Sequence, residues 1–320
     1  MIQLYEKPQT EENQMYYFIL NPTAKSKGTD DTWQYVSRTL QQQGIPYRLC
    51  ATQYSGHAGR LARDISTEDP HATIVVIGGD GSIHEVINGL ENPGSVTLGV
   101  IPAGSANDFS KGMGISHDPR KALAAILHPS KTIKMDVGRI SGGSSGNNRF
   151  CVSAGIGFDA AVCHEALSSP IKDALNRVNA GMLTYSLIAA KQIALYEPGP
   201  CEIRLDGERR FHFSRVFFIA VMNQRYEGGG LMMTPDAKPD DGVLNVFICS
   251  NMPKSKLIVC LPTAKFGKHV NIKGTHFLKG RSVEILCDRE RPIHLDGESG
   301  GKSRTLKAGF ESEKINVIVR

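Results

Sequence analysis

The segment that most constrains the fold is an apolar run followed at once by a glycine-rich turn. Residues 72–77 read Ala-Thr-Ile-Val-Val-Ile, and Gly78-Gly79-Asp80-Gly81-Ser82 come directly after them. The run predicts a buried central strand, and residues 83–90 predict a helix after the turn. The N–H groups of such a turn can face a phosphate, with Asp80 placed to hold Mg²⁺. The alternative is a plain tight turn with Ser82 as the helix N-cap.

The first part of the chain alternates strand-like and helix-like segments. Strands are expected at 16–20, 47–51, 72–77 and 96–101, and helices at 30–43, 56–65 and 83–90. This order predicts βαβ units around a parallel sheet. A second Gly/Ser turn, Pro102 to Phe109, ends the strand at 96–101. The two turns should meet at the carboxyl edge of the sheet, where open α/β sheets bind ligands.

The pattern changes at about residue 136, where strands and glycine-rich turns become dominant. Strands are expected at 150–153, 215–222, 244–249 and 282–286, with one helical interruption at about 171–195. Residues 141–148, Ser-Gly-Gly-Ser-Ser-Gly-Asn-Asn, predict a flexible hairpin tip. The second part should therefore be a mostly β domain.

Composition excludes several classes of protein. An apolar fraction of 40% and a charged fraction of 22% are typical of a globular chain. No apolar run reaches the length of roughly 18 residues that spans a membrane, and the polar start has no signal-peptide core, so we expect a cytoplasmic protein. Seven scattered cysteines without a C-x-x-C pair predict reduced thiols. A net charge of +5 does not discriminate between bilayers, nucleotides and nucleic acids.

The two turns together resemble the diacylglycerol kinase catalytic domain, a family shared with sphingosine and ceramide kinases. Gly-Gly-Asp-Gly-Ser at 78–82 is followed by Pro-Ala-Gly-Ser-Ala-Asn-Asp-Phe at 102–109. Neither a Rossmann nor a P-loop glycine motif occurs at these turns, which disfavours those two nucleotide-binding classes. The resemblance continues in order along the chain at residues 21–24, 55–58, 155–160, 181–185, 235–242 and 295–298.

The resemblance implies an ATP site and a catalytic base. The implied ATP-binding positions are Asn21, Pro22, Thr23, Thr52, Gly78, Gly79, Asp80, Gly81, Ser82, His84, Ser105, Asn107 and Asp108, with Glu298 near the nucleotide or its metal. Asp296 would accept the proton of the lipid hydroxyl, and Asp80 would act with it. Taken alone, Asn107 and Asp108 are more typical of capping residues.

The bacterial branch of the family also implies a structural Mg²⁺ in the second domain. The matching ligands are the backbone oxygens of Lys238 and Val243 and the carboxylate of Asp241. The residues alone would predict only an acidic turn over 235–242. Two positions depart from the family pattern: Ser82 replaces the usual Thr, and Lys25 stands where Gly is common.

We therefore expect an α/β nucleotide-binding domain over 1–136 and a β-sandwich-like lipid domain over 137–306, with residues 307–320 returning to the first domain. The expected reaction is phosphorylation of a diacylglycerol or related lipid alcohol by ATP and Mg²⁺. An NAD kinase and a non-catalytic nucleotide- or lipid-binding protein are the alternatives. We expect the enzyme to reach its lipid substrate at the inner face of a membrane, through transient contact with that membrane. We expect no nucleic-acid partner, and a homodimer is possible.

Three questions remain open at this level. The acceptor could be diacylglycerol, phosphatidylglycerol, undecaprenol or a sphingoid base. Residues 171–195 carry apolar side chains at helical spacing together with basic residues, and could touch a bilayer or pack on their own domain. His57 and His84 lie next to the proposed ATP loops, and the sequence assigns them no further role.

Overall fold

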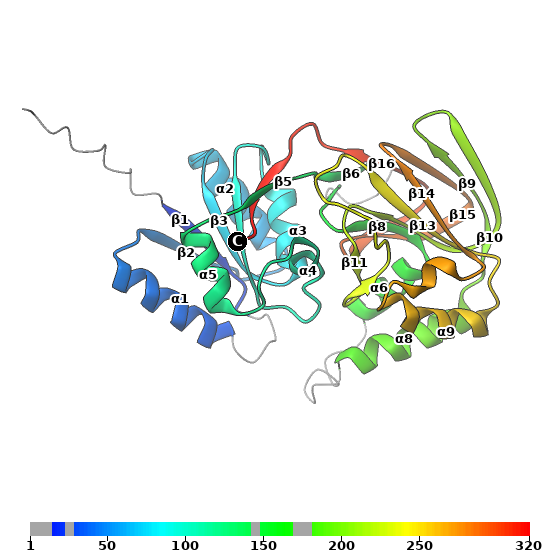
Figure 1. The fold of residues 1–320 in the computed structure, drawn as a ribbon, viewed down its shortest axis with the longest axis horizontal. Coiled ribbons are helices and arrows are strands. Elements are labelled where there is room, and N and C mark those ends of the chain that lie inside the picture. Colours follow the sequence, from blue (N-terminus) through cyan, green and yellow to red (C-terminus); the bar gives the residue numbers. More distant parts are fainter. Residues whose placement is uncertain (1–14, 23–28, 142–147, 169–180) are drawn as a thin grey trace, which may run out of the picture.

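The computed structural model describes residues 15–22, 29–141, 148–168 and 181–320. Two lobes lie side by side, one built on a mostly parallel sheet and the other on a larger antiparallel sheet (Figure 1). The expected combination of an α/β domain and a mostly β domain is confirmed.

The first sheet has the strand order β2-β1-β3-β4-β17-β5. Its strands are β1 (Tyr16–Leu20), β2 (Tyr47–Ala51), β3 (Thr73–Gly78), β4 (Thr97–Pro102), β5 (Thr132–Met135) and β17 (Ile315–Ile318). The first four strands and β17 run parallel, whereas β5 pairs antiparallel with β17. The helices are α1 (Thr29–Gln43), α2 (His57–Glu68), α3 (Asp80–Gly89), α4 (Asp108–Met113) and α5 (Pro119–Leu127).

Both faces of this sheet are covered, which explains why its central strand is apolar at every position. Ile74 and Val76 of β3 pack with α2 and α3, whereas Val75 and Ile77 pack with α1 and α5 on the opposite face. Each such fully buried side chain contributes about 1.5–3 kcal/mol relative to an exposed one. The sheet is therefore a rigid platform for the loops at its carboxyl edge.

The second sheet is antiparallel, with the order β14-β13-β10-β8-β15-β16-β6-β7 and β9 pairing with both β10 and β15. Its strands are β6 (Gly138–Ser141), β7 (Arg149–Phe150), β8 (Ser153–Gly157), β9 (Gly199–Leu205), β10 (Arg209–Met222), β13 (Leu244–Ser250), β14 (Thr275–Gly280), β15 (Val283–Leu295) and β16 (Glu298–Phe310). A separate hairpin joins β11 (Tyr226–Glu227) to β12 (Leu231–Met232).

Alternate side chains of the second sheet form two cores. Ile219 and Val221 of β10 face the interior of the curled sheet, whereas Phe218 and Met222 face a layer of helices. Those helices are α6 (Phe158–Ser168), α8 (Gly181–Leu195) and α9 (Lys254–Ala264), followed by the short helix η1 (Lys268–Asn271). The sequence predicted one helical interruption and missed α6 and α9. Residues 171–180 of the predicted helix lie outside the described part of the chain.

Several predicted boundaries were wrong. The helix after the first glycine turn begins at Asp80 rather than at residue 83, because Gly79 already occupies its N-cap position. The strand expected at 150–153 is divided into β7 and β8. Residues 307–310 still pair with β6 in the second sheet, so the chain returns to the first domain only after Phe310.

Among the described helices, none has the length and apolar character needed to cross a bilayer.

Candidate active site

Two glycine-rich loops meet at the carboxyl edge of the parallel sheet, as the sequence predicts. Gly78 and Pro102 are paired at the ends of β3 and β4. A Cβ atom on Gly104 would lie 2.5 Å from the Cα of Gly79, so a side chain there would force the backbone to shift. Asn107 closes the second loop, since its Oδ1 accepts from the Gly104 N–H at 3.0 Å and its Nδ2 donates to the Gly104 carbonyl at 2.8 Å. This edge is therefore built largely of backbone.

Asp80 begins α3, and its carboxylate ties the two loops together. Its Oδ2 accepts from the N–H of Asp108 at 3.1 Å, and its Oδ1 accepts from the N–H of Phe109 at 3.0 Å. These amides at the start of α4 have no partner inside their own helix. Burial raises the pKa of Asp80, the two backbone N–H groups oppose that increase, and the charge of Asp296 adds to it. The predicted contact of Asp80 with Mg²⁺ stays a prediction.

Asp108 links the first domain to the β11–β12 hairpin of the second. Its Oδ2 accepts from the N–H of Gly229 at 2.7 Å, whereas its Oδ1 lies 3.8 Å from the Lys111 ammonium and finds no hydrogen-bond partner among the described residues. Burial and the neighbouring charge of Asp80 raise the pKa of Asp108 to about 6. A carboxylate held in this way accepts a proton or a cation readily.

Asp296 and Gly297 form the two-residue turn between β15 and β16. Both have positive φ values, 51° and 87°, as a type I′ hairpin turn requires. The turn directs the Asp296 carboxylate onto the start of β8, where it accepts from the N–H groups of Cys151, Val152 and Ser153 at 2.8–3.1 Å. These bonds replace strand pairing at Cys151 and Val152, which is why the strand predicted at 150–153 is interrupted.

His84 completes the environment of Asp296 from the other domain. Its Nδ1 lies 3.0 Å from Asp296 Oδ2, and both side chains are almost fully buried. Burial lowers the pKa of His84, but the hydrogen bond and charge of Asp296, with Glu298 and Glu85, outweigh this and raise it. The two residues are 212 positions apart. The sequence therefore carried no signal for this pair, and His84 is better placed to hold Asp296 than to contact ATP.

Glu298, the first residue of β16, reaches the start of α3. A Cβ atom on Gly81 would lie 2.8 Å from Glu298 Oε1, so this carboxylate rests over the first helical turn. Negative charge at a helix N-terminus is stabilised by the helix dipole. The β15–β16 turn therefore brings two carboxylates of the second domain to the glycine-rich loop of the first.

Comparison with known proteins matches both halves of this arrangement. Residues 15–140 match the diacylglycerol kinase catalytic domain, and residues 152–318 match the YegS C-terminal NAD kinase beta sandwich-like domain. YtlR of Bacillus subtilis, named as a candidate lipid kinase, is 31% identical over 290 residues, which span 89% of this chain and 94% of that protein. The chain belongs to the diacylglycerol kinase family. It is accordingly a kinase enzyme.

Other relatives agree with this assignment. A diacylglycerol kinase of Staphylococcus carnosus is 26% identical, with 94% of this chain and 93% of that protein covered. A crystal structure of a candidate diacylglycerol kinase from Bacillus anthracis superposes with a TM-score of 0.74 at 22% identity, covering 96% and 98% of the two chains. An NAD kinase from Archaeoglobus fulgidus in complex with ATP shares the fold more distantly, with a TM-score of 0.52 at 11% identity over 95% and 93%.

The remaining predicted ATP-binding residues of the kinase lie at the ends of neighbouring strands. Asn21 and Pro22 follow β1, and Thr52 follows β2. The Asn21 N–H donates to the carbonyl of Ile77 at 3.3 Å, which places Asn21 beside the start of the glycine-rich loop. Ser105 is exposed in the second loop. Thr23 and Lys25 lie outside the described residues.

The predicted Mg²⁺ turn of the kinase is packed against the domain junction. Asp241 Oδ1 accepts from the N–H of Val243 at 3.0 Å, and the Val243 carbonyl accepts from Asn245 at 3.3 Å. The Gly242 N–H donates to the buried Asp136 at 2.8 Å. These bonds make an ordered Asx turn. Oxygen donors of this kind suit Mg²⁺, and ligation by Lys238, Asp241 and Val243 stays a prediction.

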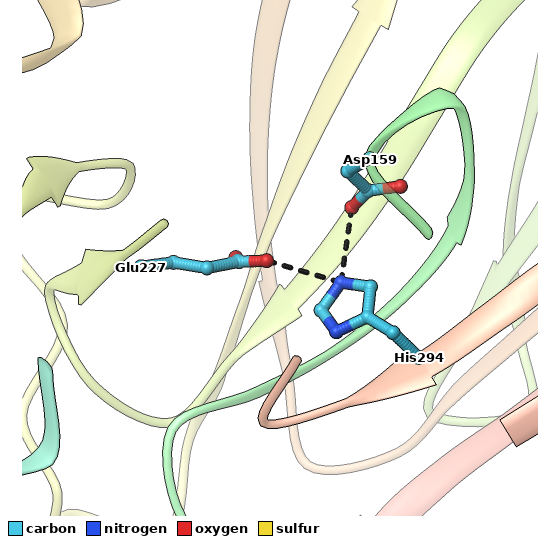
Figure 2. A group of neighbouring side chains, drawn as sticks. All are labelled: Asp159, Glu227 and His294. Carbon is cyan, nitrogen blue, oxygen red and sulfur yellow. Dashed lines mark hydrogen bonds and ion pairs between the residues drawn. The ribbon is translucent and has the colours of Figure 1, made fainter. Parts of the chain in front are cut away.

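A buried cluster of the kinase was not anticipated from the sequence. His294 Nε2 lies 3.0 Å from Glu227 Oε1 and 3.2 Å from Asp159 Oδ2 (Figure 2). Asp159 lies in the first turn of α6 and Glu227 ends β11, while His294 projects from β15 over Gly155, where a Cβ atom would collide with it. In the sequence, the only signal of this crowding is Gly155, the first glycine of the Gly-Ile-Gly-Phe-Asp segment.

The three donor atoms lie within 4.8 Å of one another, close enough to consider a metal site. The Gly297 N–H lies 3.3 Å from His294 Nδ1, which directs the ring proton to Nε2, between the carboxylates. Burial disfavours a charged ring, but the charge of Glu227 and the other acidic neighbours raise the pKa of His294 well above its ordinary value. The two carboxylates therefore favour a proton on Nε2, and the three side chains form a hydrogen-bonded triad in which a metal ion would have to displace that proton.

Proposed function

We propose that the kinase transfers the γ-phosphate of ATP to a hydroxyl of diacylglycerol or a related lipid alcohol, giving phosphatidic acid or the equivalent lipid phosphate. One observation carries the proposal: Asp296 and Glu298 reach from the second domain to α3 at the glycine-rich loop. This juxtaposition would place a proton acceptor beside the phosphates of a nucleotide. The family and the names of its members support the lipid acceptor.

The nucleotide would lie along the carboxyl edge of the first sheet. Backbone N–H groups at the start of α3 would face its phosphates, with Asn21, Thr52 and Ser105 around it. Mg²⁺ would neutralise charge on the phosphates, and the carboxylates of Asp80 and Glu298 are the side chains placed to hold it. The second Mg²⁺ would stabilise the turn at Lys238, Asp241 and Val243.

In the reaction, the lipid oxygen forms a bond to the γ-phosphorus while the bond between that phosphorus and the β–γ bridging oxygen breaks. ADP leaves with the electron pair of that bond. Asp296 accepts the proton of the lipid hydroxyl. His84 and the three N–H groups of residues 151–153 fix the carboxylate in one orientation, so that little reorganisation is needed when the lipid arrives.

The test is transfer of radiolabelled phosphate from γ-labelled ATP to a panel of lipids in detergent mixed micelles with Mg²⁺. The matched control is Asp296→Asn, which keeps the shape of the side chain and removes its charge. Label in one lipid with the wild type, lost in the variant, would support both the reaction and the base. Label appearing in NAD instead would favour an NAD kinase, and nucleotide binding without transfer would favour a non-catalytic protein.

A further inference from the structure

One segment of the chain is basic without any acidic residue. Between residues 251 and 283 there are seven Lys and Arg and no Asp or Glu. The charge of this segment, +7, is therefore larger than the net charge of the whole chain, which is +5. Five of the lysines belong to α9, η1 and the loops that flank them: Lys254, Lys256, Lys265, Lys268 and Lys273. The described structure gives none of these five an ion pair with a carboxylate.

Large apolar side chains are exposed among these lysines. Phe266 is 69% exposed, Ile258 52% and Val270 37%, and Leu195 at the end of the neighbouring α8 is 65% exposed. These four are half of the large apolar residues that the described structure leaves exposed. Leaving a Phe or Ile side chain largely in water is unfavourable relative to burying it. Such a surface is suited to a partner that is apolar and anionic together.

The two helices form one continuous face. The Lys254 ammonium donates to the Ala194 carbonyl of α8 at 2.6 Å, and the Lys256 ammonium donates to the Lys273 carbonyl at 2.9 Å. Figure 1 shows α8 and α9 side by side along one edge of the second lobe. We call this surface the α8–α9 face, made of the five lysines with Leu195, Ile258, Phe266 and Val270.

The α8–α9 face is packed directly against the hairpin that enters the active site. Gly267 has φ +65°, and a Cβ atom there would lie 3.2 Å from the sulfur of Met232 in β12. His269 is buried, with its Nε2 2.9 Å from the Met233 carbonyl. The other end of the same hairpin donates a hydrogen bond from Gly229 to Asp108. A partner bound to the face would therefore lie one hairpin away from Asp108 of the candidate active site.

We propose that the α8–α9 face docks the kinase on the surface of an anionic phospholipid bilayer. Phe266, Ile258, Val270 and Leu195 enter the headgroup region, and the lysines lie at the level of the lipid phosphates, where their charge is attracted to the anionic surface. This deepens the proposed function, because it names the surface from which the lipid substrate is reached.

The experiment is co-sedimentation of the full chain with vesicles of phosphatidylcholine alone or with added phosphatidylglycerol, at low and high salt. The variants are Lys265→Glu with Lys268→Glu, and Phe266→Ser. The matched controls are Lys131→Glu with Lys302→Glu, two exposed lysines elsewhere, and Leu286→Ser, an apolar side chain that is 46% exposed on β15. We expect at least about tenfold weaker binding for the lysine variant, several-fold weaker for Phe266→Ser, and less than about twofold change for the controls.

Equal binding to neutral and anionic vesicles, or equal loss in the controls, would overturn the proposal. So would a dimer in analytical ultracentrifugation that Phe266→Ser dissociates, since the face would then bind a second copy, or a preference for nucleic acid over anionic vesicles. Vesicle binding needs neither ATP nor transfer, and transfer in mixed micelles needs no docking on a bilayer. Binding without transfer would therefore defeat the proposed function alone, and transfer without binding would defeat the docking surface alone.

Discussion

Asp296 of the second domain lies 3.0 Å from His84 of the first, and this contact joins the hairpin turn of β15–β16 to the helix that follows the glycine-rich loop. Both side chains are at least 96% buried, so the pair is shielded from solvent screening. Neither residue can move without disturbing the junction of the two domains. The candidate active site and the domain interface are thus one structure.

Replacing Asp296 separates its chemical role from its structural one. Asp296→Asn keeps the size and shape of the side chain but replaces one carboxylate oxygen by an NH₂ group and removes the charge, so we expect transfer to fall by about 10²- to 10⁴-fold with little change in lipid KM. Asp296→Ala leaves three backbone N–H groups unpaired and should also lower the free energy of unfolding by about 2–4 kcal/mol. Steady-state kinetics and urea unfolding of the two variants check this. Equal activity of Asp296→Asn and wild type would contradict the assignment of the base.

The His84–Asp296 pair should make stability depend on pH. The pKa of His84 is raised in the folded state, so the folded protein binds its proton more tightly than the unfolded chain does. The resulting stabilisation is fully present below the ordinary histidine pKa of about 6.5 and is lost as pH rises through the folded value. We expect His84→Gln to be destabilised more at low pH than at high pH relative to wild type. Urea unfolding at several pH values measures the difference in stability between His84→Gln and wild type. A difference that does not change with pH would contradict this prediction.

The backbones of Gly79 and Gly104 lie too close together to leave room for a side chain at residue 104. In Gly104→Ala the new Cβ would lie 2.5 Å from a backbone carbon, so the loop must shift. We expect a loss of about 1–3 kcal/mol of stability and weaker ATP binding. Gly309→Ala is the matched control, because its Cβ would meet no atom within 4 Å. Thermal unfolding and nucleotide titration of both variants provide the test, and similar behaviour of the two would refute it.

The ionised carboxylate of Asp108 should destabilise the folded protein, because folding raises its pKa instead of lowering it. Burial and Asp80 raise its pKa to about 6, so the folded state binds its proton where the unfolded chain has already lost it. The contribution of Asp108 to the free energy of unfolding therefore falls as the pH rises from about 4 through about 6. Relative to wild type, Asp108→Asn should gain roughly 1–2 kcal/mol of stability between about pH 5 and about pH 8. Parallel pH profiles for the two proteins would exclude this role.

The sequence predicted the parts of the kinase that depend on local pattern. The apolar run at 72–77 and the glycines after it identify the central strand and its loop, because burial on both faces and a close backbone approach leave a local trace. Asp296 and Gly297 also carry a local turn signal, but they entered the prediction only through the family resemblance. Helix α6 was missed because it follows the Gly-rich strand β8 without a break, and its apolar residues show no one-sided pattern to distinguish it.

Pairs that form across the domains left no such trace. His84 with Asp296, Asp108 with Gly229, and Glu298 over Gly81 each join residues more than 100 positions apart. No local propensity or periodicity specifies contacts of that kind, since they depend on how two finished domains dock. The family resemblance supplied Asp296 and Glu298 as site residues, but the partners that hold them became visible only in the folded chain.

The triad of His294, Glu227 and Asp159 gives a final prediction. In His294→Gln two carboxylates would remain close together in a buried site without a counter-charge, so we expect a loss of about 3–5 kcal/mol of stability. The double variant with Glu227→Gln removes one of those charges and should recover part of the loss. If the two substitutions instead destabilised additively in urea unfolding, the residues would not be coupled. Added Zn²⁺ or Mn²⁺ should not raise the wild-type melting temperature, because the ion would have to displace the proton that the carboxylates hold on Nε2, and a clear increase would favour a metal site over a hydrogen-bonded triad.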